Sequence, residues 1–399
     1  MNSDADRFWM PKDQRLSWEF LAPRSRRETV PGMKGAPRRY FFFWARNAIF
    51  HCLRALDIAP GDRILLPAYI CVAAVEPILA YGAEADFYDV NPDGTMDLAG
   101  LAARMDARTR AVLAVHYFGF PQPIRQIRDL CDRRRLFLIE DCAHVLRRRT
   151  EGQPLGTLGD ASVFSWRKFL PVYDGGELVL NRWKRELDVA WQKESLLFTL
   201  KVAKNLLEPL LARARRPAGD DLRSLPTSGN DAAPTAAAGP GRLFKPLAVD
   251  NNSAGFEPAL VNFPMSRLSR ILLGCSDVQA IAVARRSNYV CLQREFASVA
   301  GIRPLFASLP DDVCPWVFPI FFDGLPNAHK PLRRMGIPAV TWGGVRPAGI
   351  SRERFPGADF LYENLVFLPL HQGLRQQDLE RIVTAVRAVR AAGNGAQIG

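Results

Sequence analysis

Lys168 is a candidate catalytic residue, because it is one of only nine lysines in a chain of 399 residues and lies between an apolar segment and a turn. The apolar segment 161–164 precedes it, and Asp174-Gly175-Gly176 follows it. A lysine buried at such a position has a lowered pKa, so its amine can act as a nucleophile and as a base. Asp141 follows another apolar segment, 136–139. A carboxylate in that position could hold a proton on a heterocyclic nitrogen.

A mostly parallel sheet is predicted to position these residues. Short apolar segments at 63–67, 85–90, 111–116, 136–139, 161–164 and 177–180 are typical of strands, and the apolar spacing over 45–56, 71–80 and 124–133 is typical of helices. Strands that alternate with helices at short spacing indicate βαβ units. Such sheets bind ligands at the carboxyl ends of their strands. His116 ends a predicted strand, and Glu140, Asp141 and Ser165 come just after predicted strands, so these residues join Lys168 as candidate site residues.

The composition excludes several classes of protein. Hydrophobic residues make up 48% and charged residues 24%, which is ordinary for a globular chain. The sequence shows neither an apolar run long enough to span a membrane nor a signal core, so we expect a cytoplasmic protein. The net charge of +12 would suit nucleic acid, a membrane surface or an anionic substrate, but no nucleic-acid recognition motif accompanies it. Seven cysteines without a CxxC pair predict free thiols and no metal site.

The length predicts several folding units, which we place as an N-terminal arm (1–44), a large domain (45–183), an insertion (184–255) and a small C-terminal domain (256–399). The small domain is predicted to contain helices near 266–298 and 376–392 and strands near 316–322 and 365–368.

The insertion combines two patterns. Residues 184–215 form a basic, leucine-striped helix or helix pair, and residues 216–255 are rich in Pro, Gly and Ala and are expected to be mobile. The insertion could be a lid over the active site, a helix that docks on anionic lipid or a partner, or a spacer.

Five stretches of the sequence resemble the DegT/DnrJ/EryC1/StrS sugar aminotransferases, which are pyridoxal phosphate enzymes of fold type I. In family order they are PGDRILLPAYICVAAVEPILAYGAEADFYDV, RTRAVLAVHYFGFP, LFLIEDCAHVL, GTLGDASVFSWRKFLPVYDGGELVLN and NLVFLPLHQGL. The resemblance covers 45–182 and resumes at about 262. It implies a large domain with a mostly parallel, seven-stranded sheet and a smaller α/β C-terminal domain.

The resemblance also implies roles for single residues. Lys168 matches the lysine that binds the cofactor covalently, and Asp141 matches the carboxylate that keeps the pyridine ring protonated as an electron sink. The backbone at Arg46 and Asn47 matches a phosphate cradle at a helix start. Ser165 matches a residue that binds the cofactor phosphate, and Asn262 matches an asparagine that reaches this phosphate from the second subunit. The remaining positions around the cofactor are Cys71, His116 and His144. For His116 a supporting role behind the site is the alternative, and for Cys71 it is simple packing.

The function that the resemblance implies is transfer of an amino group from an amino acid, glutamate by expectation, to a nucleotide-linked keto sugar in polysaccharide or secondary-metabolite biosynthesis. Family members are homodimers with shared active sites, so a homodimer is expected here. The chain departs from the family pattern at Cys71, where many members have an aromatic ring, and at Pro264, which replaces an arginine. Ser165 and Lys168 are also closer together than in most members.

Two alternatives to this function therefore stay open. One is a pyridoxal phosphate enzyme that acts on a non-nucleotide substrate. The other is a non-catalytic sensor or assembly partner. The presence of both Lys168 and Asp141 counts against the non-catalytic alternative.

Overall fold

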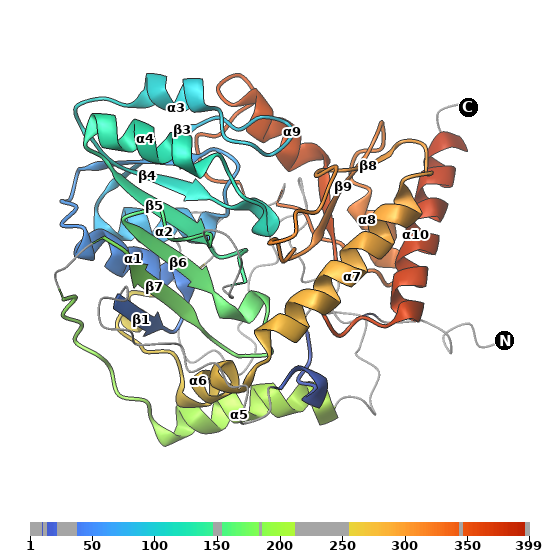
Figure 1. Ribbon diagram of the computed structural model, residues 1–399, viewed down its shortest axis with the longest axis horizontal. Helices are drawn as coiled ribbons and strands as arrows, with labels where there is room; N and C mark the ends of the chain where they lie inside the picture. The colour runs from blue at the N-terminus through green and yellow to red at the C-terminus, as the bar shows by residue number, and fades with distance from the viewer. Residues whose placement is uncertain are drawn as a thin grey trace.

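The structure is a computed structural model that describes residues 10, 14–21, 38–146, 154–182, 186–211, 255–342 and 346–395. Figure 1 shows a larger body built on a sheet and, beside it, a smaller body that ends in the C-terminal helix α10. Within the described residues, no helix combines the length and the apolar character needed to cross a bilayer.

The larger body contains a sheet of seven strands in the order β1-β7-β6-β5-β4-β2-β3. Neighbouring strands from β2 to β6 pair in parallel, whereas β7 pairs antiparallel with both β6 and β1. The strands are β1 (Arg38–Phe42), β2 (Arg63–Pro67), β3 (Glu84–Tyr88), β4 (Thr109–Val115), β5 (Phe137–Cys142), β6 (Ala161–Ser165) and β7 (Gly176–Leu180). The prediction of a mostly parallel, seven-stranded sheet is confirmed.

Helices cover both faces of this sheet. The helices α1 (Ala45–Ala55) and α2 (Val72–Tyr81) share a hydrophobic cluster with Ile64 and Leu66, while α3 (Leu98–Arg104) and α4 (Ile124–Arg134) share another with Leu65. Successive side chains of a strand point to opposite faces. A strand buried on both sides therefore has an unbroken apolar sequence, which is why β2 is Arg-Ile-Leu-Leu-Pro.

The smaller body contains a three-stranded antiparallel sheet in the order β10-β9-β8. Its strands are β8 (Ile302–Pro304), β9 (Phe318–Phe322) and β10 (Leu365–Leu368), and its helices are α7 (Val278–Phe296), α8 (His329–Arg334), α9 (Pro356–Asn364) and α10 (Gln376–Gly395). This is the smaller α/β unit that the resemblance implied.

Some elements differ from the sequence-based expectation. The helix expected over 266–298 is two helices, α6 (Arg267–Cys275) and α7, because Ser276 is extended and the Asp277 side chain caps α7 by accepting bonds from the Gln279 and Ala280 N–H groups. Of the basic helix or helix pair expected over 184–215, the structure contains α5 (Leu196–Leu211), and the described residues 186–195 before it are not helical. The segment 216–255, which was expected to be mobile, lies outside the described residues except for its last residue.

The N-terminal arm contributes to both bodies. Its short helix η1 (Trp18–Phe20) packs against α7 of the smaller body. Arg38–Phe42, which the sequence analysis placed in the arm, is the edge strand β1 of the large sheet. The division of the chain into four parts otherwise stays a prediction.

Candidate active site

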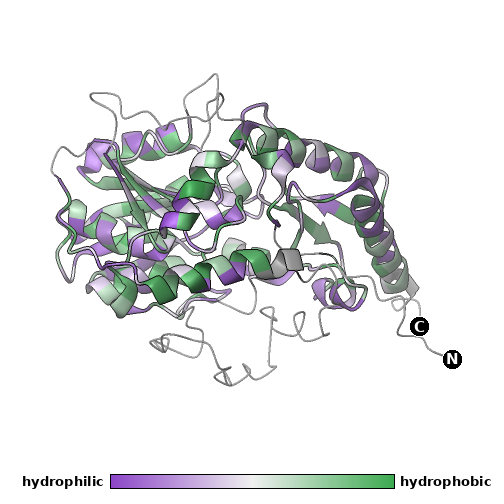
Figure 2. Ribbon diagram, turned by 90° about the horizontal axis from the view of Figure 1, so that it is seen from below, coloured by the Kyte–Doolittle hydropathy of each residue, from purple (hydrophilic) through white to green (hydrophobic). Residues whose placement is uncertain are grey.

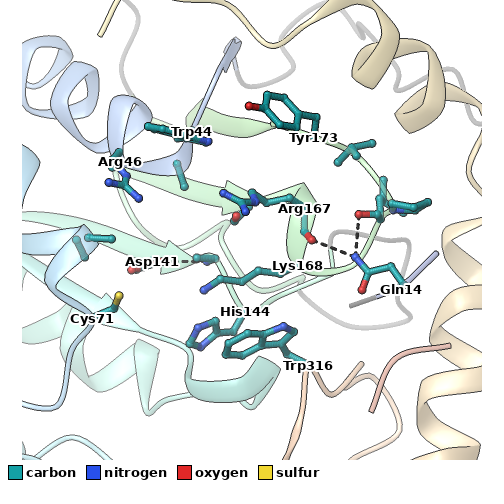
Figure 3. A pocket seen from close by; sticks show the side chains of 18 of the residues that line it. Gln14, Trp44, Arg46, Cys71, Asp141, His144, Arg167, Lys168, Tyr173 and Trp316 are labelled. Atoms are coloured by element: carbon teal, nitrogen blue, oxygen red, sulfur yellow. Dashed lines mark hydrogen bonds between the residues drawn. The ribbon is translucent and has the colours of Figure 1, made fainter. Parts of the chain in front are cut away.

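A cavity of about 590 Å³ lies at the carboxyl ends of β5 and β6. Its walls come from segments far apart in the sequence: Gln14 of the arm, the start of α1, the start of α2, the turn after β6, and Trp316 from the smaller body. Figure 3 shows the side chains of Lys168, Asp141, His144 and Trp316 gathered in this cavity. The position agrees with the expectation for a parallel sheet.

Lys168 ends the short helix η4 (Trp166–Lys168), which directly follows β6. Its Nζ lies 4.5 Å from the centroid of the Trp316 ring, a cation–π contact. Burial lowers the pKa of Lys168 to about 8, while Cys71 and Asp141 act to raise it and the charge of Arg167 lowers it further. A large share of this amine is therefore neutral, and nucleophilic, at mildly alkaline pH.

Covalent capture of pyridoxal phosphate by the cofactor-free protein should therefore depend on pH. The rate should rise as the pH passes through about 8, because only the neutral amine of Lys168 attacks the aldehyde. The Asp141→Asn variant loses a negative charge that raises this pKa, so its midpoint should lie at lower pH. Stopped-flow absorbance across a pH series measures both midpoints. A wild-type midpoint near the ordinary lysine value of 10.5 would contradict the burial of the amine.

Asp141 is the residue before the end of β5, and it faces the cavity beside Lys168 (Figure 3). Its Oδ1 accepts a 2.9 Å hydrogen bond from the Ala143 N–H. Burial raises the pKa of Asp141, and Lys168 and the Ala143 bond oppose that rise. An acidic group that is buried beside a cation suits a partner that brings its own positive charge, such as a protonated ring nitrogen.

His144 lines the cavity with its ring stacked between Phe118 and Trp316, at centroid distances of 5.7 and 4.2 Å. Its Nδ1 accepts a 3.2 Å hydrogen bond from the Phe118 N–H, which places the ring proton on Nε2. Burial, and then the charge of Lys168, lower the pKa of His144 well below its ordinary value. The residue is therefore a neutral donor through Nε2.

His116 does not reach the cavity, although it was a candidate cofactor ligand. Its Nδ1 accepts from the Gln122 N–H, so its Nε2–H donates to Glu140 Oε2 at 2.9 Å. Glu140 also accepts from the N–H groups of Gly156, Leu158 and Gly159. The structure favours the alternative that His116 supports β5 from behind the site.

The same cluster brings one possible ligand atom each from His116, Glu140 and Cys142 within 4.8 Å of one another. Both oxygens of Glu140 already accept N–H groups. We therefore interpret the cluster as a structural hydrogen-bond network and not as a metal site.

The Glu140→Ala variant should lose about 3–5 kcal/mol of unfolding free energy, because it leaves the buried N–H groups and His116 without their acceptor. Urea denaturation monitored by circular dichroism measures the loss. The control is Glu84→Ala, which removes a half-exposed carboxylate from its ion pairs with Arg63 and Arg108 and should cost about 1 kcal/mol or less. Equal losses in the two variants would contradict the structural role of Glu140.

The start of α1 borders the cavity through Trp44, Ala45 and Arg46. It can approach β7 closely because Gly176 has no side chain, since a Cβ at that position would collide with the Trp44 backbone. Ser165, at the end of β6, lines the same cavity. A helix start beside a serine hydroxyl suits a phosphate group.

Asn47 and Asn262 do not line the cavity. The Asn47 N–H bonds to the Trp44 carbonyl, and its side chain donates to the Leu260 carbonyl. Of the expected phosphate cradle at Arg46 and Asn47, only Arg46 lines the cavity, together with Ala45, and the cradle itself stays a prediction. Asn262 interacts with His51. Its role toward a second subunit stays a prediction. Cys71 does line the cavity as a half-buried free thiol.

Several lining residues were not predicted from the sequence. Trp316 and Trp342 come from the smaller body, and no local pattern links them to Lys168. Gln14 donates to the carbonyls of Arg167 and Leu170 at 3.0 and 2.8 Å, so it holds the turn that carries Lys168. Arg167 could have been singled out, because it is the neighbour of Lys168 in the motif.

The charge of the cavity is strongly positive. Arg15, Arg46, Arg167 and Lys168 line it, and Asp141 is its single carboxylate among the described residues. Arg46 lies 3.8 Å from Glu76 and over the ring of Trp44. The cavity is therefore suited to a ligand with more than one negative charge.

Comparison with known proteins agrees with this geometry. Residues 45–186 match the DegT/DnrJ/EryC1/StrS aminotransferase family. The UDP-N-acetyl-3-dehydro-alpha-D-glucosamine 3-aminotransferase of Acidithiobacillus ferrooxidans is 33% identical over 154 residues, which are 38% of this chain and 42% of that protein. The GDP-perosamine synthase of Vibrio cholerae is 34% identical over 137 residues, 34% of this chain and 37% of that protein. The chain thus spans about two fifths of the length of these curated relatives.

Solved structures extend the similarity to the whole fold. The putative sugar aminotransferase Spr1654 from Streptococcus pneumoniae, in its PMP-form, matches with a TM-score of 0.65 over 96% of this chain and 94% of that one, at 16% identity. AtS13 from Actinomadura melliaura matches with a TM-score of 0.60 over 89% and 87%, at 25% identity.

The fold is that of the fold type I transferases, and Lys168 and Asp141 meet in its cavity. Within that class, residues 45–186 match the model of the DegT/DnrJ/EryC1/StrS aminotransferase family, in agreement with the resemblance found in the motifs.

Proposed function

We propose that the protein is a pyridoxal phosphate-dependent aminotransferase that moves an amino group from an amino acid to a keto sugar. One observation carries the proposal: Lys168 and Asp141 line the same cavity. The start of α1, Ser165 and the arginines Arg46 and Arg167 line it as well. A lysine amine, a carboxylate and an anion-binding end are the three features that this cofactor requires. The residues that line the cavity therefore fit pyridoxal phosphate.

When bound, pyridoxal phosphate would act as an electron sink for the reacting amine. Lys168 would hold the cofactor aldehyde and, when released, carry a proton between the two carbons that exchange it. Asp141 would keep the proton on the ring nitrogen. His144, neutral and held by Phe118 and Trp316, would donate from Nε2 to a cofactor oxygen and fix the ring orientation.

A nucleotide-linked keto sugar is the proposed acceptor. The relatives from A. ferrooxidans and V. cholerae are named for UDP- and GDP-linked sugars. Arg15 and Arg167 line the cavity, and Arg167 is exposed, so they are available to a diphosphate. We also propose a homodimer in which Asn262 reaches the partner's cofactor phosphate, and glutamate as the amino donor.

The test is a two-step reaction followed by absorbance. Adding glutamate to the cofactor-loaded protein should abolish the visible band of the bound cofactor and release 2-oxoglutarate in stoichiometric amount. Adding a UDP-, GDP- or dTDP-linked keto sugar should then restore the band. If no amino acid changes the spectrum, the protein is not an aminotransferase.

A non-nucleotide acceptor is the second candidate. The L-glutamine:scyllo-inosose aminotransferase of Streptomyces griseus is 34% identical over 147 residues, and its name specifies a cyclic ketone without a nucleotide. The same assay decides between the candidates, because recovery of the band with scyllo-inosose and with none of the sugar nucleotides would favour the second. The assay with scyllo-inosose should also be run with glutamine as the amino donor.

A further inference from the structure

The turn that carries Lys168 is held by side chains from two other parts of the chain. The main-chain carbonyls of residues 167–170 each accept a hydrogen bond from a side chain. Gln14 of the arm donates to the first and the last of these carbonyls at 3.0 and 2.8 Å (Figure 3). Arg285 of α7 and Gln372, which follows β10, donate to the second and the third at 3.3 and 2.9 Å. The turn is therefore attached to the smaller body, which lies beside the larger one in both directions of view (Figure 1 and Figure 2).

Arg285 is the centre of this arrangement, and its side chain is buried. Its guanidinium donates to five oxygens, namely Gln372 Oε1 (3.0 Å), Gln14 Oε1 (3.3 Å) and the main-chain carbonyls of Lys168 (3.3 Å), Pro315 (3.5 Å) and Trp316 (2.9 Å). The group also lies over the ring of Phe169, 4.9 Å from its centroid. An arginine can serve all these acceptors because it carries five N–H donors in a planar fork, whereas a lysine offers three donors at one atom.

One guanidinium thus binds the main chain of both Lys168 and Trp316. The side chains of these two residues meet in the cavity, where the Lys168 Nζ lies 4.5 Å from the centroid of the Trp316 ring and that ring stacks on His144. Because the guanidinium is rigid and planar, it fixes the two main chains relative to each other. Burying a cation costs free energy, and a well-packed apolar side chain is often as stabilising. The specific contribution of Arg285 is therefore the placement of Lys168 and Trp316.

We propose that Arg285 is a positioning residue that, together with Gln14 and Gln372, fixes the amine of Lys168 beside Trp316 in the cavity. The inference rests on the proposed function, in which this amine holds the cofactor aldehyde. A reaction that needs an amine at one place loses rate when the amine moves by a fraction of an ångström to one ångström. The placement of the amine can nevertheless be measured without the cofactor, so the two proposals can fail separately.

The burial of the amine is the measurable property that depends on this placement. Burial lowers the pKa of Lys168 to about 8. The titratable and charged groups that face the amine are Asp141 of β5, Cys71 at the start of α2, Arg167 of η4, and His144. A looser turn would let water reach the amine and stabilise its charged form, so the pKa of Lys168 should rise toward its ordinary value of 10.5.

Trace acetylation of the full-length, cofactor-free protein with acetic anhydride across a pH series tests the proposal. Only the neutral amine reacts, and mass spectrometry of the Lys168 peptide gives the midpoint of its titration. Arg285→Lys keeps the positive charge and loses the fork of donors, so we expect its midpoint to rise by about one pH unit, which corresponds in free energy to about one hydrogen bond. Gln14→Ala leaves Arg285 in place, removes two bonds to the turn and should shift the midpoint in the same direction.

The matched control is Arg333→Lys on α8, which replaces another buried arginine of the smaller body, outside the cavity, and should leave the midpoint of Lys168 unchanged. Circular dichroism shows whether each variant is folded. The proposal is overturned if Arg285→Lys keeps the wild-type midpoint, or if Arg333→Lys shifts it as far. If Arg285→Lys does not fold, Gln14→Ala decides in its place by the same criteria.

The single-turnover reaction with glutamate separates this inference from the proposed function. In a working aminotransferase, Arg285→Lys should slow the reaction about tenfold or more at unchanged cofactor occupancy. An unchanged rate would overturn the inference, because the placement of the amine would then not matter to the reaction. If the wild type reacts with no amino acid, the proposed function fails, whereas the acetylation midpoints still decide whether Arg285 places the amine of Lys168.

Discussion

The Lys168→Ala variant should still take up pyridoxal phosphate, but borohydride should no longer fix the cofactor to the protein, and turnover should fall by at least about 10³-fold. Uptake should persist because Asp141, Ser165 and the start of α1 remain in the cavity. Fixation should be lost because it requires an amine at the aldehyde, and Lys168 is the one lysine among the residues that line the cavity.

Mass spectrometry of the reduced protein measures the effect, since the fixed cofactor adds its mass to one tryptic peptide. The control is Lys330→Ala on α8, outside the cavity, which should be fixed like the wild type. If Lys168→Ala is fixed as readily as the wild type, another lysine holds the cofactor and the assignment of the site is wrong.

The Asp141→Asn variant should keep its cofactor and lose most of its turnover. Its amide is nearly the size of the carboxylate and can still accept the Ala143 bond, but it lacks the charge that holds a proton on a ring nitrogen. Electrostatic contributions of this kind are worth about 2.7–4 kcal/mol in the barrier, or about 10²–10³-fold in rate. Single-turnover rates with glutamate, beside a cofactor titration, separate the chemical step from binding.

The Asp141→Glu variant tests whether charge or position matters more, because it keeps the carboxylate and moves it by one methylene. We expect it to recover part of the lost rate. A near-normal single-turnover rate in Asp141→Asn would instead show that the carboxylate does not act on the ring. Asp86→Asn, on β3 and outside the cavity, is the control for a change of net charge.

Much of the larger body could be predicted from local patterns. Each strand from β2 to β7 falls within two or three residues of its predicted range, because a strand buried on both faces is a short apolar run that ends at polar or turn residues. The same logic placed Asp141 and Ser165 at strand ends, and the Asp-Gly-Gly turn identified Lys168. These residues do meet in the cavity, since the carboxyl ends of parallel strands share one edge.

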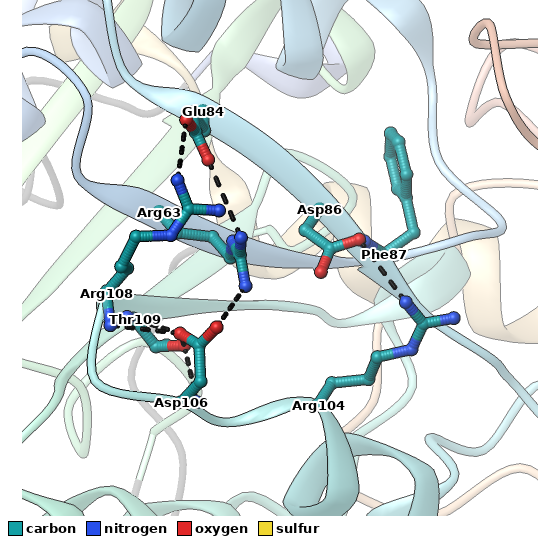
Figure 4. A network of polar contacts seen from close by, with 8 residues as sticks. All are labelled: Arg63, Glu84, Asp86, Phe87, Arg104, Asp106, Arg108 and Thr109. Atoms are coloured by element: carbon teal, nitrogen blue, oxygen red, sulfur yellow. Dashed lines mark hydrogen bonds and ion pairs between the residues drawn. The ribbon is translucent and has the colours of Figure 1, made fainter.

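Strand order was decided only by the tertiary structure. The sequence order β2, β3, β4 becomes β3-β2-β4 in the sheet. At that edge of the sheet, Arg63 of β2 reaches both Glu84 of β3 and Asp106 before β4 (Figure 4). Exposed ion pairs of this kind contribute little free energy, so they accompany the order and do not cause it. The causes are the crossover connections and the two hydrophobic clusters that cover the sheet.

The side chain at each candidate position was also oriented by packing that no local pattern reveals. His116 and His144 both follow or end apolar strands, yet His116 turns to Glu140 behind the sheet and His144 turns to Trp316 in the cavity. Trp316 comes from the smaller body, about 150 residues after Lys168 in the chain. The sequence by itself determined the types of reactive residue and the sheet edge that presents them, because both follow from short-range periodicity. The tertiary structure alone decided which face each residue occupies and what surrounds it, because burial and charge depend on segments that are distant in the chain.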